Sequence, residues 1–201
     1  IALDDTPYEF SYGAFPAPDL PLDNLLTQQG VQLGKMLFYE KKLSKDGSQS
    51  CASCHDQNNA FTDTLRFSIG VKGLPGTRQA MSVFNMAWNT NGFFWDGRAD
   101  LLRHQSLLPI QDALEMDETL ENVISKLSTD KIYQDQFTRA FGTSEITEEK
   151  LALAMEQFML SIVSVDSKYD KYLSGATALS ESEERGRQLY FAEDKHNQEI
   201  K

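Results

Sequence analysis

The hydrophobic positions divide the chain into an irregular first half and a helical second half. Residues 24–39 carry apolar side chains at helical spacing, among them Leu33 and Leu37, which predicts an amphipathic helix. Residues 40–98 show little helical periodicity and many turn-forming glycines, asparagines and prolines. A long irregular stretch in a compact domain is usually functional or wrapped around something, so we expect this one to enclose a bound group.

The second half has the regular spacing of helices. Thr147 is the predicted N-cap of a long helix, and Ser180 with Glu183 forms a predicted capping box for a last helix through Leu189. No convincing strand pairs and no internal repeat are present in the sequence, so the predicted fold is mainly α with long loops. The apolar stripes are Leu120, Val123, Ile124 and Leu127; Tyr133, Phe137 and Phe141; and Leu151, Met155, Phe158 and Ile162.

Composition narrows the classes of partner. The chain has 201 residues, 40% of them hydrophobic, and a net charge of −11 from 19 basic and 30 acidic residues. An acidic surface repels nucleic acid and anionic membranes and favours a partner with a basic face. No apolar run is long enough to span a bilayer. Residues 1–22 contain four prolines and are expected to form an extended arm.

The two cysteines of the chain lie together in Cys51-Ala52-Ser53-Cys54-His55, which is the C-x-x-C-H signal for covalent attachment of a c-type haem. Each thiol adds to one vinyl group of the porphyrin, and the adjacent His55 can ligate the iron through its neutral imidazole. A dithiol redox pair would want a βαβ context, whereas the flanking residues are polar and loop-like. A zinc site would need the distant His104 or His196 as further ligands.

The haem motif also carries an expectation about localisation. Covalent haem attachment normally takes place outside the bacterial cytoplasm, so we expect an exported, periplasmic protein. The chain begins at Ile1 without a basic, apolar leader, so any export signal is expected to have been removed or to lie outside this sequence.

Several motifs, in this order and spacing, resemble the bacterial di-haem cytochrome c peroxidases and their MauG-like relatives. The resemblance extends from about Leu20 to about Phe191, and the string F-W-D-G-R-A is its most specific part. The motifs are residues 33–38 before the haem loop, 60–63 (A-F-T-D), 82–85 (S-V-F-N), 94–99 (F-W-D-G-R-A) and Glu115-Met116.

The resemblance implies a domain organisation around two haems. Residues 23–165 resemble the N-terminal, peroxidatic c-type haem domain with a cytochrome c-like fold, and residues 166–201 resemble the start of the second, electron-entry haem domain. The family places a second C-x-x-C-H soon after residues 189–191, and this chain has none there. We therefore expect one haem c in this chain, a second in the full protein, and a second domain that is truncated here.

The resemblance also implies roles for three residues, and a fourth, Arg98, is a candidate because of its charge and its place two residues after Asp96. Glu115 matches the distal carboxylate that moves a proton during peroxide cleavage, although acids are also common at helix starts. Gln105 matches the neighbouring distal glutamine, and its alternative is a solvated helix position. Trp95 matches the tryptophan between the two haems, or is a core aromatic residue. Arg98 pairs with a haem propionate or with Asp96.

Three positions bear on the iron and on calcium. Val71 stands where many family members have a histidine that caps the iron of the resting enzyme, and valine cannot ligate iron. We therefore expect an open, high-spin haem, unless another residue such as His104 takes that place. Gln79 falls where the family often offers an asparagine to an interdomain calcium, so calcium binding by Gln79 is a further hypothesis.

The leading functional prediction is a peroxidase that reduces hydrogen peroxide to water with electrons from a small cytochrome c or copper protein. Family members are often dimers, so a homodimer is expected. MauG-like oxidation of a partner protein is the alternative within the family. A mono-haem electron carrier is the alternative outside it, with Met116 as the sixth ligand that closes the iron. A haem sensor is the weakest reading, because no signalling segment accompanies the haem region.

Overall fold

The computed structural model describes the backbone of residues 1–198 and the side chains of residues 1–191. Eight α-helices, three short 3₁₀ turns and a few isolated β-bridges make up the regular structure of this part of the chain. The prediction of a mainly α fold with long loops is confirmed. His196, one of the alternative zinc ligands, has its side chain outside the described residues. Within residues 1–198 there is no helix that is long and apolar enough to cross a membrane.

The chain forms two compact units, one of residues 1–10 and 18–163 and the other of residues 11–17 and 164–201. The second unit contains α7 and α8, and the first contains the other helices. The helices are α1 (Gln28–Phe38), α2 (Cys51–Cys54), α3 (Leu102–Gln111), α4 (Leu120–Ser128), α5 (Lys131–Phe141), α6 (Glu148–Ser161), α7 (Lys168–Leu173) and α8 (Glu181–Gln198).

Helix starts agree with the sequence at the predicted caps. The Thr147 hydroxyl accepts a hydrogen bond from the Lys150 backbone N–H at the start of α6. At the start of α8, Ser180 and Glu183 cap each other reciprocally, as the capping box predicts. The first predicted helix begins at Gln28 rather than at residue 24, because Thr27 provides the cap by accepting from the Gly30 N–H.

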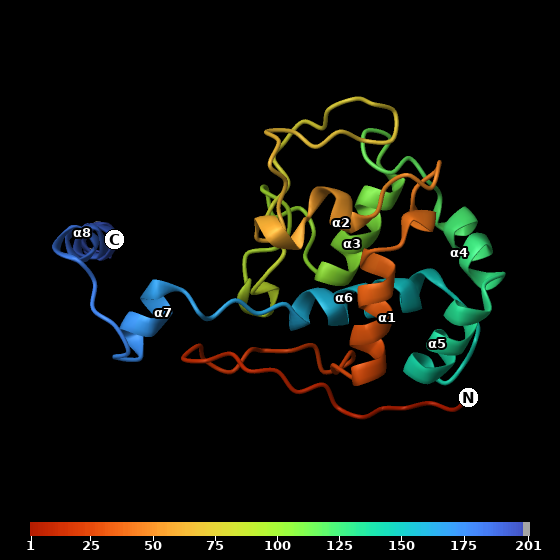
Figure 1. Cartoon of the computed structure of the whole chain (residues 1–201), viewed down its shortest axis with the longest axis horizontal. Coiled ribbons are helices and arrows are strands. Elements are labelled where there is room, and N and C mark those ends of the chain that lie inside the picture. Colours follow the sequence, from red (N-terminus) through yellow and green to blue (C-terminus); the bar gives the residue numbers. More distant parts are fainter. Residues whose placement is uncertain (199–201) are drawn as a thin grey trace. The chain divides into compact units, whose positions relative to one another are not determined.

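The core of the first unit is centred on α6, which packs against α1 and α3 (Figure 1). The backbones of α1 and α6 touch at Gly34, where an added Cβ would lie 2.0 Å from the Ala154 carbonyl oxygen. On either side of this contact Leu33 and Leu37 of α1 are fully buried. The close crossing therefore depends on a position without a side chain.

Helix α3 was not predicted from the pattern, and its composition explains why. Its buried residues are Leu102, Ser106 and Ile110, so a polar residue interrupts the apolar stripe. Pro109 lies inside the helix, and the N-cap position has no side-chain hydrogen bond. Two ion pairs hold this helix in place instead: Arg103 binds Glu156 of α6 at 2.9 Å and Asp23 at 2.8 Å.

The segment between α1 and α3 is irregular, as predicted, and is fixed by individual contacts. Within it residues 68–76 form a small hairpin, closed by hydrogen bonds from Gly76 N–H to Ser68 O (2.9 Å) and from Gly70 N–H to Leu74 O (3.0 Å). Before the haem motif, the Lys126 ammonium of α4 binds the carbonyl oxygens of Lys42 and Ser44 at 3.2 and 3.0 Å. These contacts hold the loops in place without a regular sheet.

Candidate active site

The C-x-x-C-H motif folds as a single helical turn followed by His55. In α2 the Ser53 hydroxyl accepts a hydrogen bond from the Ser50 N–H (3.0 Å), which starts the turn. The spacing places Cys51 and Cys54 on the same side of that turn as free thiols. Burial raises the pKa of the Cys51 thiol to about 12 and also raises the pKa of Cys54. Both sulfur atoms border one cavity.

The imidazole of His55 is held in one tautomer by the backbone. Its Nδ1 lies 3.0 Å from the carbonyl oxygen of Phe61, and a carbonyl can only accept, so Nδ1 carries the proton. Ala60 and Phe61 both have positive φ (55° and 54°), and this turn brings the Phe61 carbonyl back to the histidine. Burial lowers the pKa of His55 and keeps it neutral. With the proton on Nδ1, the lone pair lies on Nε2, which is the atom that can ligate a metal ion.

The cavity next to these residues has a volume of about 920 Å³. It is walled by the haem motif, residues 76–83, residues 91–98, α3 and the loop of residues 114–116, with Met155 and Met159 of α6 behind. Two thiols one turn apart, a neutral histidine with its lone pair on Nε2 and a largely apolar wall of this size fit a covalently bound haem c.

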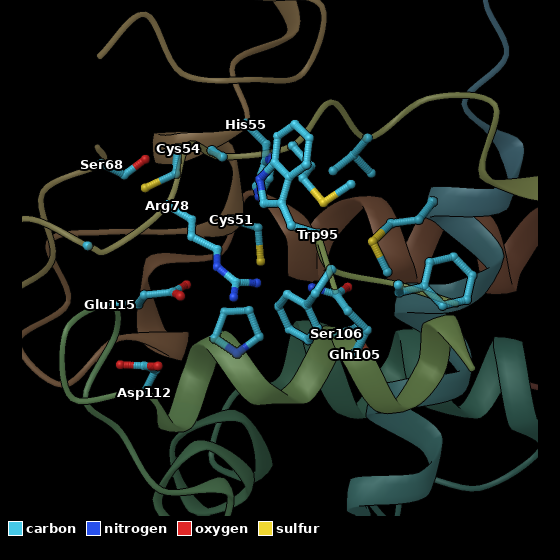
Figure 2. A pocket seen from close by; sticks show the side chains of 18 of the residues that line it. Cys51, Cys54, His55, Ser68, Arg78, Trp95, Gln105, Ser106, Asp112 and Glu115 are labelled. Carbon is cyan, nitrogen blue, oxygen red and sulfur yellow. The ribbon is translucent and has the colours of Figure 1, made fainter. Parts of the chain in front are cut away.

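Gln105 and Glu115 also border the cavity. Figure 2 shows Gln105 on α3, across the pocket from Cys51 and His55, with Glu115 at one end. Within the described residues neither the Gln105 amide nor the Glu115 carboxylate has a hydrogen-bond partner in the protein. Both side chains are therefore free to bind a small molecule in the cavity.

The carboxyl group of Glu115 has an altered proton affinity. It is accessible from the cavity, yet protein surrounds that cavity, and this desolvation raises the pKa of Glu115. The negative charge of Asp112 raises this pKa further, while the positive charge of Arg98 lowers it. A carboxyl group of this kind can exchange protons closer to neutral pH than an exposed glutamate does.

The comparison with known proteins decides the family. A family model described as di-haem cytochrome c peroxidase matches residues 28–178. The chain belongs to this family. The methylamine utilization protein MauG of Methylophilus methylotrophus is 34% identical over 187 residues, which cover 91% of this chain and 56% of that protein. The cytochrome c551 peroxidase of Nitrosomonas europaea is 38% identical over 161 residues, covering 80% of this chain and 48% of the relative.

Comparison with solved structures supports the assignment of this chain to the family. A MauG-like protein associated with microbial copper homeostasis superimposes with a TM-score of 0.81 at 35% identity, covering 88% of this chain and 53% of that one. This likeness confirms the prediction of a cytochrome c-like haem domain. The chain spans about half the length of the curated relatives that it matches.

In this member of the di-haem cytochrome c peroxidase family, Trp95 is an exposed residue of the cavity rim. Its side chain is 61% exposed, and its indole Nε1–H donates to the Gln79 carbonyl oxygen at 2.9 Å. The alternative of a buried core aromatic is therefore wrong for Trp95. The indole is held in place by its nitrogen while its ring borders the opening.

The two arginines of the rim meet at one carboxylate. Asp96 binds Arg98 and Arg78, each at 2.9 Å, and the two guanidinium groups lower the pKa of Asp96 to about 2. Arg98 also lies 3.7 Å above the centre of the Phe94 ring. The predicted Arg98–Asp96 pair is thus present. Arg78, which extends into the pocket in Figure 2, was missed from the sequence because the fold alone brings it to Asp96.

The remaining candidates are placed as follows. His104 is exposed and does not border the cavity, whereas Met116 is buried and borders it. The Val71 backbone N–H donates to the Glu115 carbonyl oxygen at 2.9 Å. The Gln79 side-chain amide donates to the Asp63 carbonyl oxygen at 2.9 Å. Across residues 1–191 no group of three or more His, Cys, Asp or Glu side chains could hold a metal ion.

Proposed function

We propose that this chain is the peroxide-reacting part of a periplasmic di-haem enzyme. In this proposal the enzyme reduces hydrogen peroxide to water with electrons from a small cytochrome c or copper protein. The observation that carries it is the Glu115 carboxylate, which borders the same cavity as the Nε2 of His55, with a raised pKa and no hydrogen-bond partner among the described residues. The overall reaction takes two electrons and two protons per peroxide and gives two molecules of water.

In this proposal Cys51 and Cys54 form the thioether bonds and His55 ligates the iron. The haem, when bound, supplies the redox chemistry at which the O–O bond is broken. Glu115 takes the proton from the near peroxide oxygen and delivers it to the far one, which then leaves as water. The Gln105 amide donates a hydrogen bond that orients the peroxide. Glu115 must be ionised to accept the proton, and its raised pKa makes it a stronger base than an exposed glutamate.

Further roles belong to the same proposal. Trp95 assists electron transfer to the haem from a second haem of the full protein, Arg98 binds a haem propionate, and Gln79 contributes to a calcium site between domains. The full protein acts as a homodimer. Residues 23–165 are the peroxidatic domain, and residues 166–201 begin the electron-entry domain. The exposure of the Trp95 ring and its place at the rim of the cavity support a role in electron transfer.

The iron is proposed to be open on the side of Glu115. Val71 has no group that ligates metals, and His104 does not border the cavity. The resting ferric haem of this domain is therefore expected to be high-spin, which electron paramagnetic resonance of the full-length protein measures. A low-spin signal assigned to this haem would contradict an open site.

The test of the proposed function is the reaction of Glu115 variants with peroxide. Glu115→Gln keeps the shape of the side chain and removes the base, so we expect the second-order rate constant for peroxide to fall by about 100-fold. Stopped-flow absorbance of the haem-loaded, full-length protein measures this constant, and the pyridine haemochrome spectrum controls for haem content. Equal rate constants for Glu115→Gln and wild type would sink the proposal.

Oxidation of a partner protein, as in a MauG-like enzyme, is the second candidate function. The observation that favours it is the exposed Trp95, through which an electron could leave a protein substrate that is too large to enter the cavity. The electron source that the full-length wild type accepts separates the two candidates. Under the peroxidase proposal, peroxide turnover is sustained by a small redox protein. Under partner-protein oxidation, a partner protein is oxidised by peroxide and a small redox protein sustains little turnover.

A further inference from the structure

The loop that carries Glu115 is anchored through its backbone to the end of α3. The N–H groups of Glu115 and Asp117 both donate to the Asp112 carbonyl oxygen at 3.0 Å. The Glu118 N–H donates to the Ile110 carbonyl oxygen at 2.9 Å. These bonds fix the shape of the loop, and further contacts decide where the loop sits against the cavity.

Asp117 makes those contacts with two lysines from different segments, and we name this group of Lys45, Lys72 and Asp117 the Asp117 clasp. The Asp117 carboxylate binds Lys72 Nζ at 2.9 Å through one oxygen and Lys45 Nζ at 2.9 Å through the other. Its side chain is 15% exposed, and the two lysines hold the pKa of Asp117 below its ordinary value. One carboxylate thereby joins three segments of the chain.

The three joined segments all border the cavity or lead into it. Lys72 lies in the hairpin of residues 68–76, and Lys45 lies six residues before Cys51. Backbone bonds run alongside the clasp, from Val71 N–H to Glu115 O (2.9 Å) and from Lys45 N–H to Met116 O (3.0 Å). The contacts that hold Glu115 in position relative to the haem motif are therefore adjacent to the Asp117 clasp.

The backbone conformation of Asp117 gives a second reason to think that its charge matters. Its φ of 49° lies in the left-handed region, where glycine is the easiest residue and aspartate is tolerated. Conformational ease alone would favour glycine at this position. The two ion pairs give a reason for a carboxylate here that the backbone does not.

We propose that Asp117, through Lys45 and Lys72, is a positioning residue that holds Glu115 in place for the reaction with peroxide. This inference rests on the proposed function of Glu115. It has a consequence for the effect of salt. Hydrogen peroxide is uncharged, so ionic strength does not change its encounter with the site by steering. The two lysines are largely exposed, so salt screens their pairs with Asp117 and loosens the loop.

The experiment compares Asp117→Asn with Asp130→Asn in the haem-loaded, full-length protein. Asp130 forms a similar pair with Lys42 at 2.6 Å, caps α5 and does not border the cavity, so it is a matched control. At low salt we expect the peroxide rate constant of Asp117→Asn to fall by about 10-fold or more, because displaced catalytic groups lose rate steeply. Asp130→Asn should react like wild type. The rate constant of wild type should fall as salt is added, while that of Asp117→Asn should stay constant.

Lysine variants make the test independent of any folding defect in Asp117→Asn. Lys72→Met should lower the peroxide rate constant, whereas Lys72→Arg retains an ion pair and should restore it. Equal rate constants for Asp117→Asn and wild type, or for Lys72→Met and Lys72→Arg, would overturn the inference. Glu115→Gln is measured in parallel. If Glu115→Gln is slow and Asp117→Asn is not, the clasp fails and the proposed function stands; if Glu115→Gln is fast, the proposed function fails.

Discussion

Two acidic residues flank Glu115 and differ in what balances their charge. Asp117 is neutralised by Lys45 and Lys72. Asp112 borders the cavity, accepts a hydrogen bond from the Leu114 N–H (2.8 Å) and has no ion pair within the described residues. Desolvation raises the pKa of Glu115, and the uncompensated charge of Asp112 raises it further. At the scale of residues, the pKa of Glu115 depends on which of the neighbouring aspartates is paired with a lysine.

Replacement of Asp112 with asparagine should shift the pH dependence of the peroxide reaction. The reaction needs ionised Glu115, so its rate constant rises as the pH rises through the pKa of Glu115. Asp112 raises that pKa, so Asp112→Asn should lower it and move the rising limb of the pH–rate profile to lower pH. Asparagine still accepts from the Leu114 N–H, which preserves the turn. Stopped-flow rate constants across pH measure the shift.

The exposed Glu121 on α4 offers a control for this shift, since Glu121→Gln removes one negative charge away from the cavity. Its pH–rate profile should coincide with that of wild type. A limb that stays in place in Asp112→Asn, or moves to higher pH, would contradict the effect assigned to Asp112.

The haem motif could be predicted because its residues are adjacent in the sequence. The residues that only the fold brings to the cavity could not be predicted. Cys51, Cys54 and His55 carry their own spacing signal. Arg78 and Asp112 reach the cavity from separate loops, and no periodic pattern relates them to Glu115. The Phe61 carbonyl that orients His55 depends on two consecutive residues with positive φ, which composition did not indicate because neither is glycine.

At the scale of elements, the crossing of α1 and α6 positions the haem motif that follows α1. The contact of Gly34 with the Ala154 carbonyl leaves no space for a methyl group. Gly34→Ala must push the helices apart or bend them. We expect it to lower the free energy of unfolding by about 3 kcal/mol, at the upper end of what overpacking costs. Chemical denaturation of the haem-loaded protein measures this loss.

Gly186 provides the matched control, because it lies inside α8 and an added Cβ there would meet nothing within 4 Å. Gly186→Ala should leave stability unchanged or raise it by up to about 1 kcal/mol through helix propensity. Gly34→Ala with wild-type stability would show that the crossing tolerates a side chain.

The helices that the sequence predicted are those in which apolar residues recur at helical spacing and are buried. Helices α4, α5 and α6 have buried stripes that the sequence displays, including Val123, Phe137 and Met155. Helix α3 packs through Arg103 on the buried Glu156, which is a tertiary interaction without a local signature. The sequence predicted that the segments around the cavity are irregular. It did not predict their paths, because tertiary contacts determine them.

At the scale of the whole molecule, the length of the relatives makes a prediction about haem number. The chain spans about half of the MauG and peroxidase relatives that it matches. We therefore expect the natural-length protein to carry two covalent haems on a longer chain. Intact mass spectrometry measures chain length and haem number together. One haem on a chain that ends near Lys201 would contradict the di-haem proposal and favour an electron carrier.

The burial of the two thiols constrains the order of events during synthesis of the protein. In the closed fold burial raises the pKa of Cys51 to about 12, so at neutral pH its sulfur is almost entirely a protonated thiol. Both cysteines line the cavity, where the edge of a porphyrin must already lie for bonds to form. Under the proposed function we therefore expect haem to be attached to an open chain, before the loops close. The haem would then act as a template for folding rather than as a late addition to a finished protein.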